Sequence, residues 1–225
     1  GVGQFCTNPG LVMLEGDPGD AFGGTLTALM GETAAGTMLT SGICQAYRDG
    51  VSNLKAIDGV EALVSGDGDA KRAAAAVFKT DAATFLAGGG IDVVVFGPAT
   101  LLVTHDGRGQ LLELARSMEG QLTATLHGTE QDLQEYAELV QVLETRVGRL
   151  VVNAFPTGVE VCHSMVHGGP FPATSDGRST SVGTQAIYRF ARPVCYQGFP
   201  QSALPDELTD ANPLGVKQLV DGRLK

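Results

Sequence analysis

The sixth residue of the chain is a cysteine, the residue type in this sequence best suited to act as a nucleophile. Cys6 lies in the segment Gly-Gln-Phe-Cys-Thr at residues 3–7. A thiolate attacks carbonyl carbon readily, but free cysteines in proteins are more often small, buried, apolar residues. The segment alone therefore leaves two interpretations of Cys6, a reactive thiol and a packed one.

A second group of chemically capable residues lies near residue 165. Cys162, His163 and His167 are three possible metal ligands within six residues, but Zn²⁺ needs three or four ligands in tetrahedral geometry. Glycines and a proline follow at 168–170 and no second ligand cluster exists, so we expect a hydrogen-bonded loop histidine and no metal. A pair between Cys6 and His163 or His167, as in a cysteine hydrolase, requires a contact that sequence spacing cannot show.

Composition excludes several classes of partner. The 225 residues are 43% apolar and carry 15 Lys and Arg against 25 Asp and Glu, a net charge of −10. That charge repels phosphate backbones and anionic lipids. No apolar run approaches the ~18 residues of a membrane span, and the N-terminus lacks the features of a signal peptide. We therefore expect no nucleic-acid or membrane partner and a cytoplasmic location, with four cysteines too few for a disulfide framework.

Hydrophobic periodicity predicts strands that alternate with helices. The pattern predicts strands at 10–16, 121–126 and 148–155, and two strands in 91–105 broken at Gly97-Pro98. It predicts helices after an Asp17 N-cap, across 37–54, across 107–120, and from a capping box at Thr129 to Val147, and leaves 70–80 open between helix and strand. This alternation indicates an α/β fold with a largely parallel sheet covered on both faces.

The C-terminal third is expected to differ. Residues 168–183 are rich in Gly, Pro, Ser and Thr, which predicts a long functional or interface-forming loop. Residues 186–199 have the character of a strand, and Pro193 confines it to a sheet edge or a bulge. The polar tail from Pro200 is expected to wrap the surface.

Several blocks taken in order resemble the aldehyde dehydrogenase superfamily from its catalytic cysteine onward. They are GQFCT, FGPATLLV, EGQLTATL, a capped helix, GRLVVN and a Gly-Pro-Phe loop before a Pro-containing strand. The likeness is greatest to the α-ketoglutarate semialdehyde (2,5-dioxopentanoate) dehydrogenases, through GTMLTSGICQAYRDGV, GVEVCHSMVHGGPFPATSDGRSTSVGTQAIYRFARPVCYQGFP and ALPDEL. The resemblance covers nearly all of the chain.

The resemblance implies an organisation for the chain. Residues 1–185 would form the catalytic domain, with a mostly parallel sheet flanked by helices. Residues 186–225 would supply an edge strand at Arg192–Tyr196, through which a homo-oligomer forms, and a wrapping tail. The family's dinucleotide-binding domain would lie largely upstream, so that the chain would be a fragment unlikely to be active alone.

The resemblance also implies a reaction. Cys6 would attack an aldehyde, α-ketoglutarate semialdehyde, to give a thiohemiacetal, which loses hydride to NADP or NAD and becomes a thioester that water cleaves. The backbone N–H of Cys6 would be one oxyanion donor. The family's second donor, an Asn, and its general-base Glu lie upstream of the cysteine.

One position departs from the family pattern. Where the family has a Glu that binds the nicotinamide ribose, this chain has Val94, while Phe96 keeps the family's aromatic contact near the nicotinamide. Losing such a hydrogen bond would cost ~1.5 to 3 kcal/mol. Because of this departure, a second interpretation stays open, in which the chain is a non-catalytic homologue with a binding or assembly role. Phe155, Pro156 and Thr157 are candidates to line the aldehyde pocket, with core packing as the alternative for Phe155.

Overall fold

The structure is a computed structural model, and it describes residues 1–66, 68–88, 91 and 95–225. The chain divides into two compact units, Gly1–Ile187 and Tyr188–Lys225, each of which is considered by itself. The predicted departure at Val94 lies outside the described residues.

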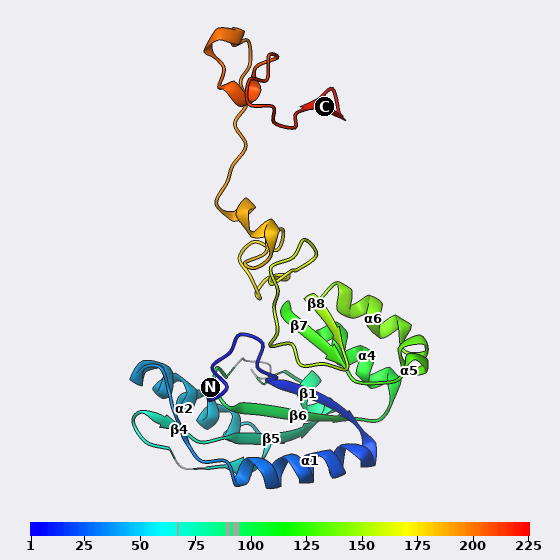
Figure 1. Cartoon of the computed structure of the whole chain (residues 1–225). Helices are drawn as coiled ribbons and strands as arrows, with labels where there is room; N and C mark the ends of the chain where they lie inside the picture. The colour runs from blue at the N-terminus through cyan, green and yellow to red at the C-terminus, as the bar shows by residue number, and fades with distance from the viewer. Residues whose placement is uncertain (67, 89–90, 92–94) are drawn as a thin grey trace. The chain divides into compact units, whose positions relative to one another are not determined.

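A four-stranded sheet forms the centre of the first unit. Its strand order is β1 (Leu11–Glu15), β6 (Ala99–His105), β5 (Ala76–Asp81) and β3 (Glu61–Ser65). β6 pairs in parallel with both β1 and β5, and β3 closes the sheet in antiparallel pairing with β5 (Figure 1). The predicted α/β architecture with mostly parallel strands is confirmed.

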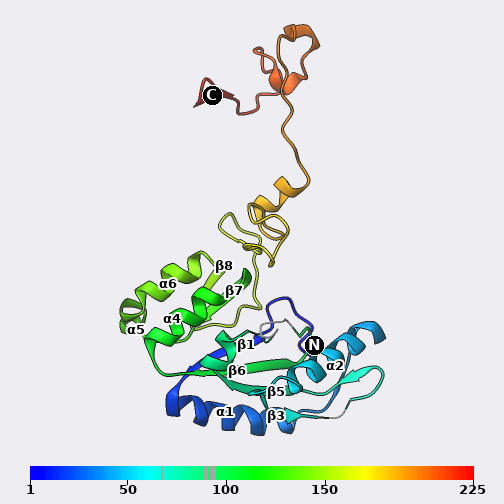
Figure 2. The ribbon, with the colours of Figure 1, turned by 180° about the vertical axis from the view of Figure 1, so that it is seen from behind.

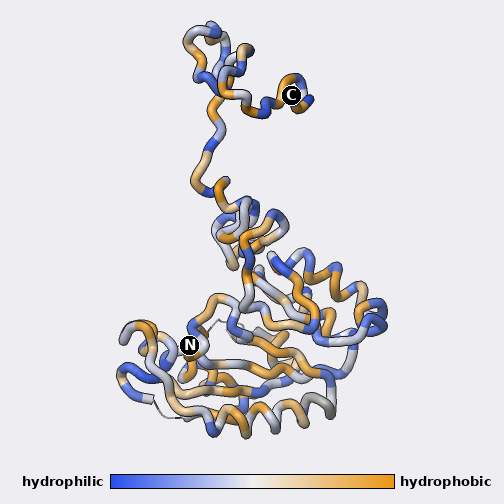
Figure 3. The backbone as a smooth tube through the Cα atoms, in the orientation of Figure 1, coloured by the Kyte–Doolittle hydropathy of each residue, from blue (hydrophilic) through white to orange (hydrophobic). Residues whose placement is uncertain are grey.

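The two inner strands are apolar on both faces. Phe78 in β5 and Val103 in β6 are fully buried, and Figure 3 shows both strands as largely hydrophobic. The position of β5 inside the sheet also explains the structure of segment 70–80, which the sequence pattern left open between helix and strand. Its alanines favour a helix by intrinsic propensity, but burial on both faces favours a strand, so the segment forms β4 (Arg72–Ala73) and β5. β4 pairs with β2 (Gly36–Thr37).

Two long helices precede β3 in the chain. α1 (Gly16–Gly31) runs along one face of the sheet and contacts all four of its strands (Figures 1 and 2). β1 leads into α1 without a linker, so the N-cap position falls on Glu15 and the predicted Asp17 N-cap is wrong. α2 (Ser41–Lys55) begins after Thr40, whose hydroxyl accepts a hydrogen bond from the Ile43 N–H.

A second layer follows β6. β7 (Gln121–Leu126) and β8 (Val147–Val152) form a parallel pair, as predicted. The helices that follow β6 are short: α4 (Arg108–Ser117), α5 (Glu130–Glu135) and α6 (Ala137–Glu144). The short α3 (Ala82–Leu86) lies between β5 and β6. α4 packs on α6, and α6 packs on β8.

The helix predicted from Thr129 to Val147 starts as expected but is interrupted. The capping box is confirmed, because the Asp132 N–H donates to the Thr129 hydroxyl while the Asp132 carboxylate accepts from the Thr129 N–H. The helix breaks at Tyr136 into α5 and α6. Tyr136 donates its hydroxyl proton to the Glu15 carboxylate, and its ring lies 6.0 Å from the Arg108 guanidinium, so tertiary contacts hold the residue at the break.

The second unit contains little regular structure. It holds the short hairpin of β9 (Leu219–Val220) and β10 (Arg223–Leu224) and the 3₁₀ turns Gln201–Ala203 and Asp206–Leu208; a further turn, Thr184–Arg189, crosses the boundary between the units. Residues 190–200 form neither strand nor helix, so the predicted edge strand at Arg192–Tyr196 is not formed. A strand needs a ladder partner, none of the described residues pairs with this segment, and Pro193 has no N–H to donate.

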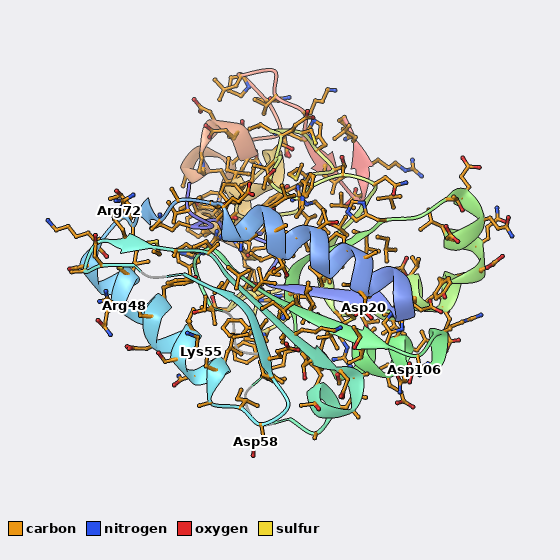
Figure 4. All side chains as sticks on the ribbon, turned by 90° about the horizontal axis from the view of Figure 1, so that it is seen from below. Asp20, Arg48, Lys55, Asp58, Arg72 and Asp106 are labelled. Atoms are coloured by element: carbon orange, nitrogen blue, oxygen red, sulfur yellow. The ribbon has the colours of Figure 1, made fainter. Side chains whose placement is uncertain are left out.

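Charged side chains lie outside the core. In Figure 4 the labelled charged residues, Asp20, Arg48, Lys55, Asp58, Arg72 and Asp106, lie around the periphery of the sheet and helices. Among the described residues, none of the helices combines the length and the apolarity that crossing a bilayer requires.

Phe78→Ala tests the importance of the central strand. We expect it to lower the free energy of unfolding by about 3–5 kcal/mol, because the ring is removed from a site with no exposed surface. Phe190→Ala is the matched control, since that ring is 88% exposed, and its effect should stay within about 0.5 kcal/mol. Urea unfolding would measure both. Equal losses for the two variants would contradict the assigned core.

Candidate active site

The loop before β1 carries Cys6 and is fixed on the segment that precedes β6. The Asn8 side-chain amide donates to the carbonyl of Gly97 at 3.2 Å. Gly3 also lies against this carbonyl, with a φ of +61°, and a Cβ at Gly3 would be only 2.3 Å from the Gly97 oxygen. Only glycine fits such a close approach in this conformation. The loop therefore rests directly beside Phe96, the residue before Gly97.

A buried hydrogen bond ties the same loop to the chain that leaves β8. The Thr7 hydroxyl donates to the Pro156 carbonyl at 3.1 Å, and Thr7 is only 5% exposed. The Arg149 guanidinium donates to the same Pro156 carbonyl and to that of Gly158, and so it also holds this segment. Residues 155–157 are thus brought next to the residue that follows Cys6.

Cys6 itself is exposed, and its thiol has one close partner. Its Sγ lies 3.2 Å from Nε2 of His167. In the described part of the chain, no group accepts a hydrogen bond from the Cys6 backbone N–H. This N–H can therefore donate to the negatively charged oxygen that forms when the Cys6 sulfur bonds to a carbonyl carbon. The structure therefore decides between the two interpretations of Cys6 in favour of an accessible thiol.

His167 is held by its own loop and by a close approach to β8. Its backbone N–H donates to the buried Thr180 hydroxyl at 2.8 Å, and its carbonyl accepts from the Ser181 N–H at 2.9 Å. The next residue, Gly168, lies against Gly148 of β8 so closely that a Cβ at Gly148 would be 2.1 Å from the Gly168 oxygen. The loop predicted to be functional thus presents the imidazole to Cys6.

The surroundings of His167 favour its neutral form. Burial lowers the pKa of the imidazole below its ordinary value of 6.5, and the positive charge of Arg149 lowers it further. At neutral pH the imidazole is therefore uncharged and able to accept a proton. Its Nδ1 is buried and has no hydrogen-bond partner among the described residues.

The remaining predicted residues occupy different environments. The Phe96 side chain is 43% exposed and that of Phe155 is 75% exposed, so core packing of Phe155 is wrong. The Phe155 ring contacts the ring of His127 edge-on at 6.4 Å. Pro156 is buried and Thr157 is exposed.

The other cysteines and His163 do not join the site. Cys44 is fully buried, Cys195 is exposed, and the Cys162 Sγ lies 3.5 Å from the Ser164 hydroxyl. His163 Nδ1 lies 2.9 Å from the Thr184 hydroxyl. The described residues hold no group of three or more His, Cys, Asp or Glu side chains able to bind a metal ion.

Sequence reasoning missed the residues that support the site. Thr7, Asn8, Arg149 and Thr180 act through hydrogen bonds to other segments of the chain, and nothing in their local spacing indicates those partners. Arg149 alone left a signal, because an arginine inside the apolar strand GRLVV is unusual unless its charge is paired or hydrogen-bonded.

Comparison with known proteins gives a consistent set of relatives. No protein-family model matches the chain. The chain is 46% identical over 226 residues to alpha-ketoglutaric semialdehyde dehydrogenase 2 of Azospirillum brasilense and 44% identical over 230 residues to alpha-ketoglutaric semialdehyde dehydrogenase of Acinetobacter baylyi. These alignments cover 99% and 100% of the chain but 43% of each relative, so the chain spans less than half the length of the curated relatives it matches.

Solved structures share the fold at low sequence identity. The Δ-pyrroline-5-carboxylate dehydrogenase of Mycobacterium tuberculosis matches 90% of the chain and 40% of its own, with a TM-score of 0.68 and 16% identity. The succinic semialdehyde dehydrogenase of Streptococcus pyogenes, solved with NADP⁺, matches 87% of the chain and 43% of its own, with a TM-score of 0.65 and 16% identity. The chain is thus similar in sequence to two alpha-ketoglutaric semialdehyde dehydrogenases and shares its fold with solved aldehyde dehydrogenases, which is the resemblance that the sequence blocks predicted.

Proposed function

We propose that the chain is the catalytic-cysteine portion of an NAD(P)-dependent aldehyde dehydrogenase that oxidises α-ketoglutarate semialdehyde to α-ketoglutarate. The observation that carries the proposal is the exposed Cys6 thiol, on a loop fixed to two distant segments, in a chain that matches such dehydrogenases over its whole length. Because the chain spans 43% of those relatives, we expect it to be inactive by itself.

The chemistry follows from the groups around Cys6. The Cys6 sulfur forms a bond to the aldehyde carbon, and the carbonyl electron pair moves onto oxygen, where the Cys6 N–H can donate to it. Loss of hydride from the same carbon leaves a thioester on Cys6. Water then breaks the C–S bond, which releases the carboxylic acid and restores the thiol.

A nicotinamide nucleotide, when bound, supplies the hydride acceptor for this reaction. Phe96 fits such a group, because it presents a partly exposed aromatic face and adjoins the segment on which the Cys6 loop rests. The Mycobacterium tuberculosis and Streptococcus pyogenes neighbours have been solved with NAD and with NADP⁺, respectively, which supports either nucleotide, and we prefer NADP. Val94 remains the position at which the family's ribose contact would be lost.

The aldehyde is proposed to bind along the chain that leaves β8. Phe155 and Thr157 are exposed there, and Pro156 between them is fixed to the residue after Cys6. We further propose a cytoplasmic homo-oligomer, with the irregular segment Arg192–Tyr196 pairing as an edge strand only when another subunit supplies the partner.

Two other functions predict different behaviour. The contact between Cys6 and His167 is also the geometry of a cysteine hydrolase, which would cleave esters or amides and leave nicotinamide nucleotides unchanged. A non-catalytic homologue with a binding or assembly role would do neither. The sequence match to semialdehyde dehydrogenases favours aldehyde oxidation over both.

Cys6→Ala in the full-length protein tests the proposal. With α-ketoglutarate semialdehyde and NADP or NAD, we expect nicotinamide reduction by the full-length protein and none above background by the variant, because no thiohemiacetal can form. Cys195→Ala is the matched control and should keep its rate, since Cys195 is an exposed thiol of the second unit. Turnover by the Cys6→Ala protein would refute the assigned nucleophile, and silence of the folded, unaltered protein would favour the non-catalytic alternative.

Gly148→Ala tests whether the loop carrying His167 must lie close to β8. The added Cβ would meet the Gly168 oxygen at 2.1 Å, so the loop must move, and we expect kcat/KM to fall by about 100-fold. Gly24→Ala in α1 should leave kcat/KM unchanged, because a Cβ there meets nothing within 4 Å. Steady-state kinetics on both variants, with circular dichroism to check folding, would measure this. An unchanged rate in Gly148→Ala would show that the close approach does not matter for catalysis.

A further inference from the structure

We propose that His167 is the proton acceptor for the Cys6 thiol, so that the nucleophile of this site is a cysteine–histidine pair and not a lone cysteine. The inference rests on the proposed function only in taking the Cys6 sulfur as the reacting atom.

The geometry of the pair carries the proposal. Sγ of Cys6 and Nε2 of His167 are 3.2 Å apart, although the two residues are 161 positions apart in the chain. Each partner is fixed independently of the other: Thr7 bonds to Pro156, and the His167 backbone bonds to Thr180. The contact is therefore not the chance meeting of two free side chains.

The electrostatic surroundings supply an acceptor in the right protonation state. From β8 the imidazole is faced by Arg149, and from the N-terminal loop by Cys6, while Thr180 and Ser181 of its own loop are neutral. Burial and Arg149 both oppose a charge on the imidazole, so it stays unprotonated into mildly acidic solution. A base of this kind is available over the whole physiological range.

The step itself is a single proton transfer. The S–H bond of Cys6 breaks, its electron pair stays on sulfur, and the proton forms a bond to Nε2 of His167. The products are a thiolate and an imidazolium, with no change in total charge.

Alkylation of each cysteine as a function of pH tests the pair without any aldehyde or nucleotide. The 225-residue chain and the full-length protein would be treated with iodoacetamide between pH 5 and pH 10, quenched, and analysed peptide by peptide by mass spectrometry. Two other cysteines serve as references in the same sample. Cys195 is exposed and reports an unassisted thiol, and Cys44 is 0% exposed and reports folding, because it reacts only if the core opens.

The variants are chosen as a matched pair. His167→Gln removes the acceptor but keeps the backbone N–H that bonds to Thr180. His163→Gln makes the same change in the same loop at a histidine whose Nδ1 lies against the Thr184 hydroxyl and not against Cys6.

We expect the Cys6 rate to begin its rise below about pH 6.5, where His167 loses its proton, and to differ in its pH dependence from the Cys195 rate. An unassisted thiol is only a few per cent thiolate at pH 7, so His167→Gln should slow Cys6 alkylation at pH 7 by about tenfold and remove the acidic rise. His163→Gln should change neither, and Cys44 should stay protected in both variants.

Two results would overturn the proposal. One is a Cys6 profile with the same pH dependence as that of Cys195 in the unaltered protein, a comparison that needs no variant to fold. The other is an unchanged Cys6 profile in His167→Gln with Cys44 still protected. Neither depends on turnover, so the pair could stand while aldehyde oxidation fails, or fall while it is observed.

Discussion

The buried hydrogen bond from the Thr7 hydroxyl to the Pro156 carbonyl is the contact on which the site depends. It joins the loop before the first strand to the chain after the last strand of the first unit, across 149 positions of sequence. Thr7 is nearly inaccessible to water, so separating the two groups would leave a buried hydroxyl and a carbonyl unpaired at about 1–3 kcal/mol. This cost keeps Cys6 beside the segment proposed to bind the aldehyde. The Arg149 guanidinium adds two further hydrogen bonds to that segment, at the carbonyls of Pro156 and Gly158.

The site also depends on two places where one backbone segment lies very close to another. Gly3 lies against the Gly97 carbonyl, and Gly148 against the Gly168 carbonyl, at distances that no Cβ allows. Through these two contacts the central sheet and the β7–β8 pair each position one partner of the cysteine–histidine contact. The central sheet thus contributes to the site through the segments that lead into β1 and β6, which meet the chain that leaves β8 of the separate β7–β8 pair. The middle of the sheet supplies stability through Phe78 and Val103.

Local patterns predicted most of the fold and one half of the site. The apolar run before Gly16, the capping box at Thr129 and the alternation in 121–126 each depend on neighbours in sequence, so they could be read correctly. The break at Tyr136 and the strand at 76–81 depend on tertiary packing, which overrides local preference, and these could not. Cys6 was identified through blocks spread along the chain, but its contact with His167 arises from two loops that no spacing relates. The strand expected at Arg192–Tyr196 is not formed, because none of the described residues pairs with that segment.

The central claim is that Cys6 forms the covalent bond to the substrate carbon. The most direct test is to mix the full-length protein with the aldehyde and the nucleotide, quench within the first turnover, and locate the acyl group by peptide mass spectrometry. The account predicts an added acyl mass on the peptide that contains Cys6 and on none of the peptides that contain Cys44, Cys162 or Cys195. An acyl group on another cysteine, or continued turnover with no acylated peptide, would contradict it.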